Sequence, residues 1–435
     1  MKTINFSEIG EQLHQIVLDN GLQVNILPKQ NYHKTFAILT TNYGSIDINF
    51  APVGSAEVKH YPAGIAHFLE HKMFEKADHD AFDLFGKYGA DANAFTSYTK
   101  TSYLFSSTDY VHENLDILLD FVQDPYFSEA SVAKEKGIIA QEIKMYDDDA
   151  DWRGEMGLIG NLFPNHPIHL DIAGTVQSID QITPAALYEA YRTFYVPKNM
   201  NLFIASPLDP QQLATWIQEN QATKHFEANK RPKRATLNDQ SPEDIMIYRF
   251  AEMPVKRSKS FVGVKGPDES TIDRSGLVRK IKLQFLLQML FGVSSQNFAE
   301  LYRQGIVDDS FGFEVMYERS ANFVMLYGDA EDPGKFSDTI LNLLETAKDS
   351  PDLTAEHLQR LKQKRIGELL FSFNSLESIA NLYNNNNFNE ATIFDVWQII
   401  NDLTITDLQD LAAAYFLHDN TSVFHVVPKQ TENEK

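Results

Sequence analysis

The chain has 435 residues, of which 43% are hydrophobic and 12% aromatic, so it is expected to bury more than one core and to form at least two domains. This composition excludes a disordered or fibrous protein. The net charge of −22 opposes non-specific binding to nucleic acid or to an anionic membrane, because both need a basic surface.

Cysteine is absent, which excludes disulfides, thiolate metal ligands and cysteine nucleophiles. The first residues, MKTINFSEIGEQLHQIV, contain no continuous apolar run of the kind found in signal peptides. No stretch of about eighteen apolar residues occurs in the sequence, so no membrane span is expected. These features together predict a cytoplasmic protein that binds neither nucleic acid nor membranes.

Strand and helix patterns alternate through the first half of the chain. Strands are expected at residues 22–29, 35–47, 101–108 and 200–206, and helices at 62–76, 113–125, 128–146 and 184–195. Pro62, a favourable residue in a first helical turn, is expected to open the helix at 62–76.

A polar stretch low in large apolar residues follows, from about Lys224 to Asp244, and has the composition of a domain linker. The basic run KRPKR at 230–234 lies inside it. We interpret this run as a solvated part of the linker and not as a nucleic-acid patch.

Beyond the linker the earlier sequence pattern returns. Residues 402–427 resemble 181–206, and residues 340–354 resemble 114–128 at nearly the same offset. A duplicated domain of about 200 residues explains both matches. We therefore expect two similar α/β domains, each a sheet covered by helices, with boundaries at 1–224 and 244–435 and a linker at 225–243.

The segment GIAHFLEHKMFEK at 64–76 contains two histidines four residues apart. On a helix, His67 and His71 lie within about 40° of each other, and Glu70 lies on the same arc. This arrangement suits two imidazoles that hold one metal ion, with a carboxylate beside them to move a proton. Because the chain has 13 histidines, chance is an alternative explanation for the motif alone.

A catalytic zinc also needs a third protein ligand, which must be His, Asp or Glu in a chain without cysteine. Glu135 and Glu142, seven residues apart, are the best candidates, since they share one face of the helix expected at 128–146. A solvated acidic face is the alternative. The apolar run Gly137-Ile138-Ile139-Ala140 between them indicates burial, and a buried carboxylate needs a partner such as a metal.

GIAHFLEHKMFE followed about 70 residues later by EKGIIAQEIKMYDDD resembles the inverted-motif zinc peptidases of the pitrilysin and insulinase family. The nearest resemblance is to half-length, processing-peptidase-like bacterial members. The linker, the duplicated halves and the end of the first domain are similar to that family's plan as well. The resemblance implies an α+β fold in which two homologous domains, each with a mainly antiparallel sheet, form a half-clamshell.

The resemblance also implies roles for single residues. His67, His71 and Glu142 would ligate one zinc ion per chain, and Glu70 would act as general base toward water. Glu135 matches a second glutamate of the family and would orient a ligand.

Residues 89–105 resemble the family's edge strand, to which a substrate peptide adds as a further strand. Asn93, Ala94 and Phe95 would then bind substrate, whereas an ordinary hairpin is the alternative. In the second half, the family presents an arginine and a tyrosine to the substrate carbonyl. Arg303 matches the arginine, but Phe311 stands where the tyrosine belongs, and Tyr317 comes six residues later.

These implications predict a zinc-dependent metalloendopeptidase that cleaves extended peptides or small unfolded proteins in a chamber closed by a second subunit. The expected partner is a homologous subunit without the zinc motif, which would supply the missing arginine and tyrosine in a heterodimer. A homodimer is the alternative. From a different class, a non-catalytic scaffold or peptide-binding subunit of the same fold is the competing interpretation.

Overall fold

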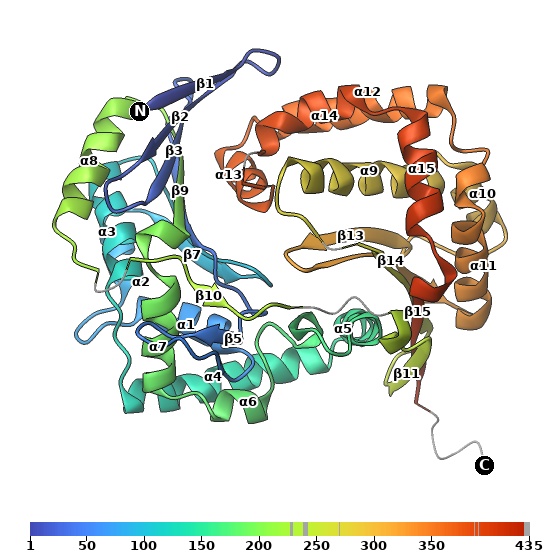
Figure 1. Cartoon of the computed structure of the whole chain (residues 1–435), viewed down its shortest axis with the longest axis horizontal. Coiled ribbons are helices and arrows are strands. Elements are labelled where there is room, and N and C mark those ends of the chain that lie inside the picture. The colour runs from blue at the N-terminus through green and yellow to red at the C-terminus, as the bar shows by residue number, and fades with distance from the viewer. Residues whose placement is uncertain (227–228, 238–241, 269, 387, 390, 430–435) are drawn as a thin grey trace. The chain divides into compact units, whose positions relative to one another are not determined.

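The structure is a computed structural model of the whole chain, and it describes residues 1–226, 229–237, 242–268, 270–386, 388–389 and 391–429 (Figure 1). Parts of the predicted linker, 227–228 and 238–241, therefore lie outside the described residues. Among the described residues, no helix is long and apolar enough to cross a membrane.

The chain forms two compact units, each of which takes segments from both halves of the sequence. Unit 1 comprises Met1–Ile143, Leu170–Thr236 and Leu370–Asn385, and unit 2 comprises Lys144–His169, Leu237–Leu369 and Asn386–Lys435. The break after Thr236 lies inside the predicted linker at 225–243. The predicted domains 1–224 and 244–435 differ from the units in two segments, 144–169 and 370–385, which pack with the unit formed mainly by the other half.

Unit 1 is built on a seven-stranded sheet in the order β1-β2-β3-β9-β4-β8-β7. Its strands are β1 (Lys2–Phe6), β2 (Glu11–Val17), β3 (Gln23–Pro28), β4 (Thr35–Thr41), β7 (Asp91–Thr96), β8 (Thr101–Ser107) and β9 (Met200–Ser206). Only the pair β3–β9 is parallel. The inner strand β4, next to the central β9, is buried at every residue, as expected for a strand with helices on both faces.

Helices cover both faces of this sheet. They are α1 (Ile65–Phe74), α2 (Ala81–Lys87), α3 (Val111–Gln123), α4 (Glu129–Asp147), α6 (Val176–Asp180), α7 (Pro184–Phe194), α8 (Pro210–Ala222) and α13 (Leu376–Asn385). Figure 1 shows α3 and α8 on one side of the sheet and α13 on the other, where it contacts β4 and β9. The Tyr383 ring stacks on Phe203 of β9 with centroids 4.3 Å apart, so a helix from the second half of the sequence completes the first unit.

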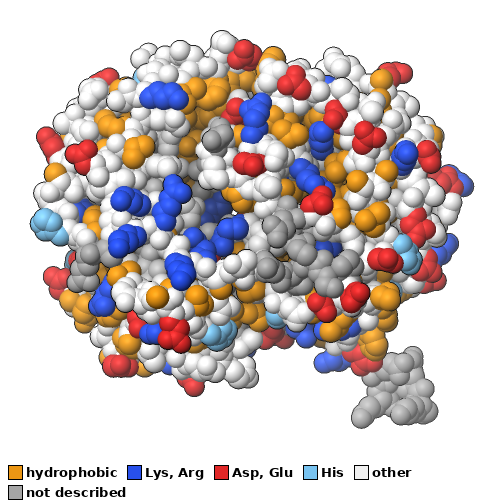
Figure 2. Space-filling model, in the orientation of Figure 1, with side chains coloured by type: hydrophobic (Ala, Val, Ile, Leu, Met, Phe, Trp, Pro, Cys, Tyr) orange, Lys and Arg blue, Asp and Glu red, His pale blue; other side chains and the backbone are white. Residues whose placement is uncertain are grey.

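A small sheet in the order β10-β5-β6 flanks unit 1, with β5 at Asn49–Ala51, β6 at Lys59–His60 and β10 at Lys233–Arg234. Arg234 Nε donates to the buried Asp47 Oδ1 at 2.8 Å. A buried carboxylate needs such a partner, which explains why this part of KRPKR is a paired strand and not the solvated linker predicted from sequence. Figure 2 shows lysine and arginine side chains gathered on the visible face around β10.

Unit 2 has a five-stranded sheet in the order β11-β15-β12-β14-β13, in which only β11–β15 is parallel. The strands are β11 (Tyr248–Met253), β12 (Ser258–Lys265), β13 (Gly312–Glu318), β14 (Ala321–Ala330) and β15 (Thr421–Pro428). The helices are α5 (Ala150–Leu162), α9 (Arg274–Phe291), α10 (Gln296–Arg303), α11 (Pro333–Glu345), α12 (Ala355–Ser372), α14 (Val396–Asp402) and α15 (Ile405–Tyr415).

Helix α5, from the first half of the sequence, packs directly on β11, β12 and β15 of unit 2. Gly154 permits this contact, because a Cβ there would lie 1.9 Å from the Phe261 ring of β12. Both units are therefore mainly antiparallel sheets covered by helices, and the predicted α+β fold class is confirmed.

Candidate metal centre

The motif helix α1 is fixed in the core of unit 1 by its apolar side. Phe68, Leu69 and Met73 are fully buried, whereas His67 and Glu70 keep 9% and 8% of their surface exposed. The helix begins at Ile65 and not at Pro62, because Gly64 precedes it in the left-handed conformation, with φ of 87°. A Cβ at Gly64 would lie 2.4 Å from the Ala173 carbonyl oxygen, so only glycine fits.

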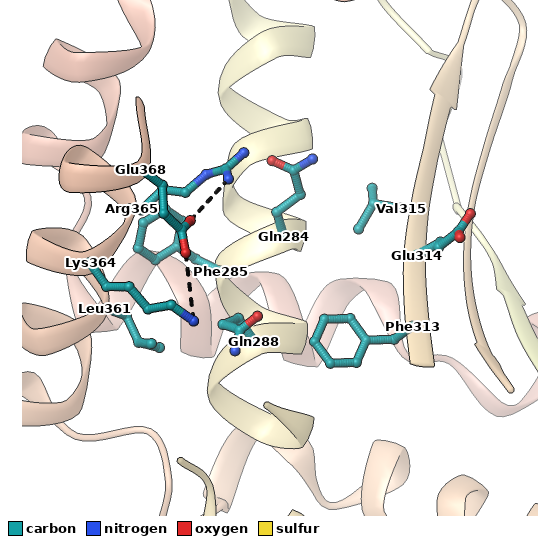
Figure 3. A pocket seen from close by; sticks show the side chains of 10 residues that line it. All are labelled: Gln284, Phe285, Gln288, Phe313, Glu314, Val315, Leu361, Lys364, Arg365 and Glu368. Atoms are coloured by element: carbon teal, nitrogen blue, oxygen red, sulfur yellow. Dashed lines mark hydrogen bonds and ion pairs between the residues drawn. The ribbon is translucent and has the colours of Figure 1, made fainter. Parts of the chain in front are cut away.

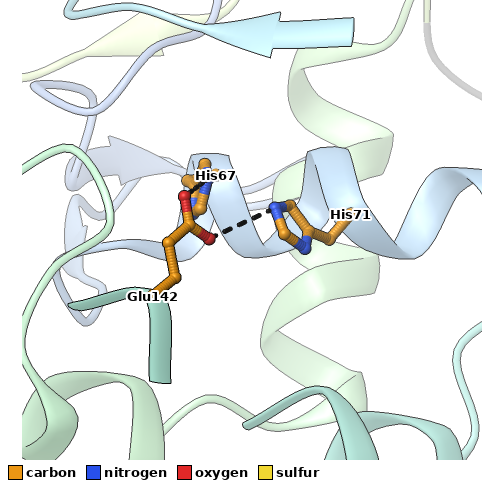
Figure 4. Close-up of side chains that lie close together, drawn as sticks. All are labelled: His67, His71 and Glu142. Carbon is orange, nitrogen blue, oxygen red and sulfur yellow. Dashed lines mark ion pairs between the residues drawn. The ribbon is translucent and has the colours of Figure 1, made fainter. Parts of the chain in front are cut away.

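Helix α4 brings Glu142 to the two histidines of α1 (Figure 4). Glu142 Oε1 lies 3.7 Å from His67 Nε2, and Glu142 Oε2 lies 3.7 Å from His71 Nε2. One ligand atom from each residue can be chosen so that all three lie within 4.8 Å of one another. Tetrahedral ligands about 2.0–2.1 Å from one zinc stand roughly 3.4 Å apart, so this donor set fits a zinc ion.

Glu135 contacts one of the three ligand candidates, His71. Its Oε1 is 3.0 Å from His71 Nδ1, and because a carboxylate accepts hydrogen bonds, Nδ1 carries the proton. The lone pair of the neutral ring is then on Nε2, the atom that faces Glu142. Burial alone would raise the pKa of Glu135, but the hydrogen bond from His71 and the charges of His71, Lys72 and Lys134 together outweigh burial and lower that pKa.

His67 has no comparable partner. Its Nδ1 is buried and makes no hydrogen bond to any residue that the structure describes. Burial, with a smaller contribution from His71, lowers the pKa of His67 to about 3. The imidazole is therefore neutral near pH 7, which is the form that binds a metal.

Glu70 belongs to the motif but not to the cluster of three ligands. Its Oε2 accepts a hydrogen bond of 2.6 Å from Thr96 Oγ1, at the end of β7. Burial raises the pKa of Glu70, although the Thr96 hydrogen bond opposes that shift. Sequence reasoning did not single out Thr96, because a threonine in a β hairpin carries no signal of its own.

The predicted substrate residues Asn93, Ala94 and Phe95 lie on β7, one of the two edge strands of the large sheet, and β7 contacts α1. Their position at an edge agrees with the expectation for this segment. Their binding of substrate stays a prediction.

The predicted carbonyl-binding residues all lie in unit 2. Arg303, at the end of α10, is exposed and forms a bidentate pair with Glu300, at 2.9 Å and 2.5 Å. The Phe311 ring packs among other phenylalanines: Phe291, Phe298 and Phe336. Tyr317 is only 4% exposed, and this burial opposes a role as a donor to a substrate carbonyl. Its hydroxyl accepts a hydrogen bond from the Thr271 amide.

The combination of H-x-x-E-H on α1 with a downstream glutamate on α4 defines the class of inverted-motif zinc peptidases. Two family models match the chain: Insulinase (Peptidase family M16) over residues 48–176, and Peptidase M16 inactive domain over residues 181–365. The first contains all of α1 and α4, and with them His67, His71 and Glu142, and the second spans the predicted linker. The chain belongs to peptidase family M16.

Relatives of the same length support this assignment. A Bacillus subtilis protein named YmfH, described as an uncharacterized zinc protease, is 43% identical over 99% of this chain and 100% of its own. The crystal structure of an M16-like peptidase from Alicyclobacillus acidocaldarius has a TM-score of 0.90 and 32% identity, covering 96% of this chain and 99% of that chain.

A longer protein shares the fold. The periplasmic protease PqqL from Escherichia coli has a TM-score of 0.73 and 19% identity, and the match covers 96% of this chain but 48% of PqqL. This chain therefore corresponds in length to half of PqqL.

Proposed function

We propose that the chain is a zinc metalloendopeptidase that hydrolyses peptide bonds of extended peptides or small unfolded proteins. The observation that carries this proposal is the convergence of His67, His71 and Glu142 within 4.8 Å, with the buried Glu70 outside the ligand set. A bound zinc would supply Lewis-acid polarisation of water and of the scissile carbonyl.

Glu70 would act as the general base and then as the general acid. It would take a proton from the attacking water and transfer it to the leaving amine nitrogen, so that its own charge is restored in each turnover. Thr96 holds Oε2 by donating its hydroxyl hydrogen, which leaves Oε1 to exchange the proton. Glu135 would keep His71 in the tautomer whose Nε2 lone pair is available.

The chain is also proposed to work with a second subunit. Phe311 occupies a phenylalanine cluster in unit 2, so this chain offers no hydroxyl at the position expected for the family tyrosine. A homologous subunit that lacks the zinc motif but carries the arginine and tyrosine would supply that hydrogen bond in a heterodimer. A homodimer is the alternative.

A second candidate function is a non-catalytic scaffold or peptide-binding subunit. The match of residues 181–365 to a model described as the M16 inactive domain favours it, as does Phe311. That model covers α7 onward and none of the three metal-ligand candidates, so it bears on the second domain and not on the zinc motif.

Peptide cleavage with and without a chelator separates the two functions. The purified chain, alone and mixed with its homologous partner, would be given a fluorogenic peptide library together with zinc analysis. Cleavage that a chelator abolishes and zinc restores supports the peptidase. Full zinc loading without cleavage, both for the chain alone and for the chain mixed with its partner, supports the binding subunit.

A further inference from the structure

A pocket of about 380 Å³ lies within unit 2, between α9, α12 and the sheet-edge strand β13 (Figure 3). That volume falls at the small end of the range for small-ligand sites, roughly 300–1,000 Å³, and it admits the end of a peptide rather than a folded domain. None of its lining residues belongs to unit 1 or to the metal cluster.

The floor of the pocket is apolar. Phe285 on α9 and Leu361 on α12 are buried, and Figure 3 shows Phe313 and Val315 of β13 directed into the same space. Glu314, between them on the strand, points to the other face, as strand alternation requires. An apolar side chain of a ligand that packed on this floor would be removed from contact with water, which favours binding.

Two glutamines stand above the floor. Gln284 and Gln288 are one helical turn apart on α9, so both side chains reach the pocket. Both are half-buried, and neither side-chain amide forms a hydrogen bond with any residue that the structure describes. A carboxamide offers donors and an acceptor together, which matches the donor and acceptor of a peptide group.

The rim on α12 carries two cations for one carboxylate. Glu368 lies 3.7 Å from Lys364 Nζ and 3.3 Å from Arg365 Nη1. All three side chains are about half exposed, so these ion pairs contribute little stability and can rearrange. The surplus positive charge would attract a second carboxylate, and arginine binds carboxylates through two parallel hydrogen bonds.

We propose that this pocket binds the C-terminal end of a peptide. The last side chain packs on Phe285 and Phe313, the preceding peptide group pairs with the glutamine amides, and the terminal carboxylate binds Arg365 and Lys364. This site goes beyond the proposed peptidase activity, because it needs neither a metal nor any residue of α1 or α4.

Binding to metal-free protein tests the site separately from catalysis. The full chain would be kept in a chelator, so that no peptide is cleaved, and titrated into fluorescein-Ala-Ala-Leu-Phe as the free acid and as the C-terminal amide. Fluorescence polarisation should show roughly tenfold tighter binding of the acid, the scale of one charge-assisted hydrogen bond. Equal affinities, or no binding up to about 1 mM, would overturn the proposal.

Different substitutions within the pocket are expected to change the affinity for the free-acid peptide in opposite directions. Arg365→Gln should remove most of the preference for the acid, whereas Glu368→Gln should strengthen acid binding, because it frees both cations. Gln284→Leu with Gln288→Leu should weaken acid and amide alike. An Arg365→Gln variant that keeps the full acid preference would assign the carboxylate to another site.

Arg360→Gln provides the matched control. Arg360 lies on the same exposed helix and pairs with Glu356 at 2.7 Å, but it does not line the pocket. Its substitution removes one positive charge from α12 and should leave both affinities unchanged. If Arg360→Gln and Arg365→Gln had equal effects, the binding would be a general charge attraction and the pocket assignment would fail.

Discussion

At the scale of single residues, Glu70 differs from the other polar residues of the motif helix because it is buried and acidic but lies outside the three-ligand cluster. His67 and His71 differ from each other too: Glu135 orients only His71. The spacing of the motif was sufficient to predict that two histidines share a face. It was not sufficient to choose between Glu135 and Glu142, and the family resemblance made that choice.

Glu70→Gln should keep zinc but lose nearly all peptidase activity. The amide is nearly isosteric with the carboxylate but cannot accept the proton from water, so we expect a loss of a hundredfold or more in kcat. Zinc content and kcat would be measured on the same preparation. Retention of more than roughly a tenth of the wild-type turnover would place the base elsewhere.

Thr96→Val should lower kcat while zinc content and KM stay nearly constant, because Thr96 acts only by holding Glu70 Oε2. We expect a loss of about tenfold, the scale of one hydrogen bond to a charged group. Thr96→Ser keeps the hydroxyl and should restore most of the rate. Equal rates for the valine and serine variants would show that the hydrogen bond has no role in turnover.

At the scale of elements, regular segments were predicted closely and their ends less well. The strand at 200–206 coincides with β9, and the helix at 128–146 is α4 shifted by one residue. The strand expected at 35–47 ends at Thr41, where Tyr43 N bonds back to the Thr41 carbonyl oxygen, and a further turn follows at residues 44–47. Helix α13 was not predicted from the sequence.

Gly64→Ala tests how the motif helix is started. An alanine at this position would have to adopt a positive φ, and its methyl group would collide with the Ala173 carbonyl. We therefore expect the free energy of unfolding to fall by about 2 kcal/mol or more, and zinc binding to weaken. Thermal unfolding and zinc titration would measure both. Gly86→Ala is the control, because a Cβ there meets nothing within 4 Å and alanine favours the helix. Equal effects of the two substitutions would contradict this explanation.

At the scale of the whole molecule, each unit is completed by a segment from the other half of the sequence. The internal repeat predicted two similar domains, but it could not reveal these segments, because the face that a helix covers is decided by tertiary packing. Unit 1 therefore depends on α13. Residues 1–236 alone lack this helix, which packs on β4 and β9.

Tyr383→Ala should destabilise unit 1 by about 3 kcal/mol, since it removes a buried aromatic ring that stacks on Phe203. Phe371→Ala, in the same segment, is the control because Phe371 is 77% exposed and should matter little. Denaturant unfolding followed by tryptophan fluorescence would compare the two variants. A similar shift for both would argue against docking of α13 on the sheet of unit 1.

The metal centre is the central claim, and zinc content tests it most directly. Wild-type protein and a His67→Ala, His71→Ala double variant would be purified in parallel, equilibrated with zinc, desalted and analysed for bound metal. The site predicts about one tightly bound zinc per wild-type chain and almost none in the double variant. Circular dichroism should show that both proteins are folded. Full zinc occupancy in the folded double variant would contradict the assignment of His67, His71 and Glu142 as ligands.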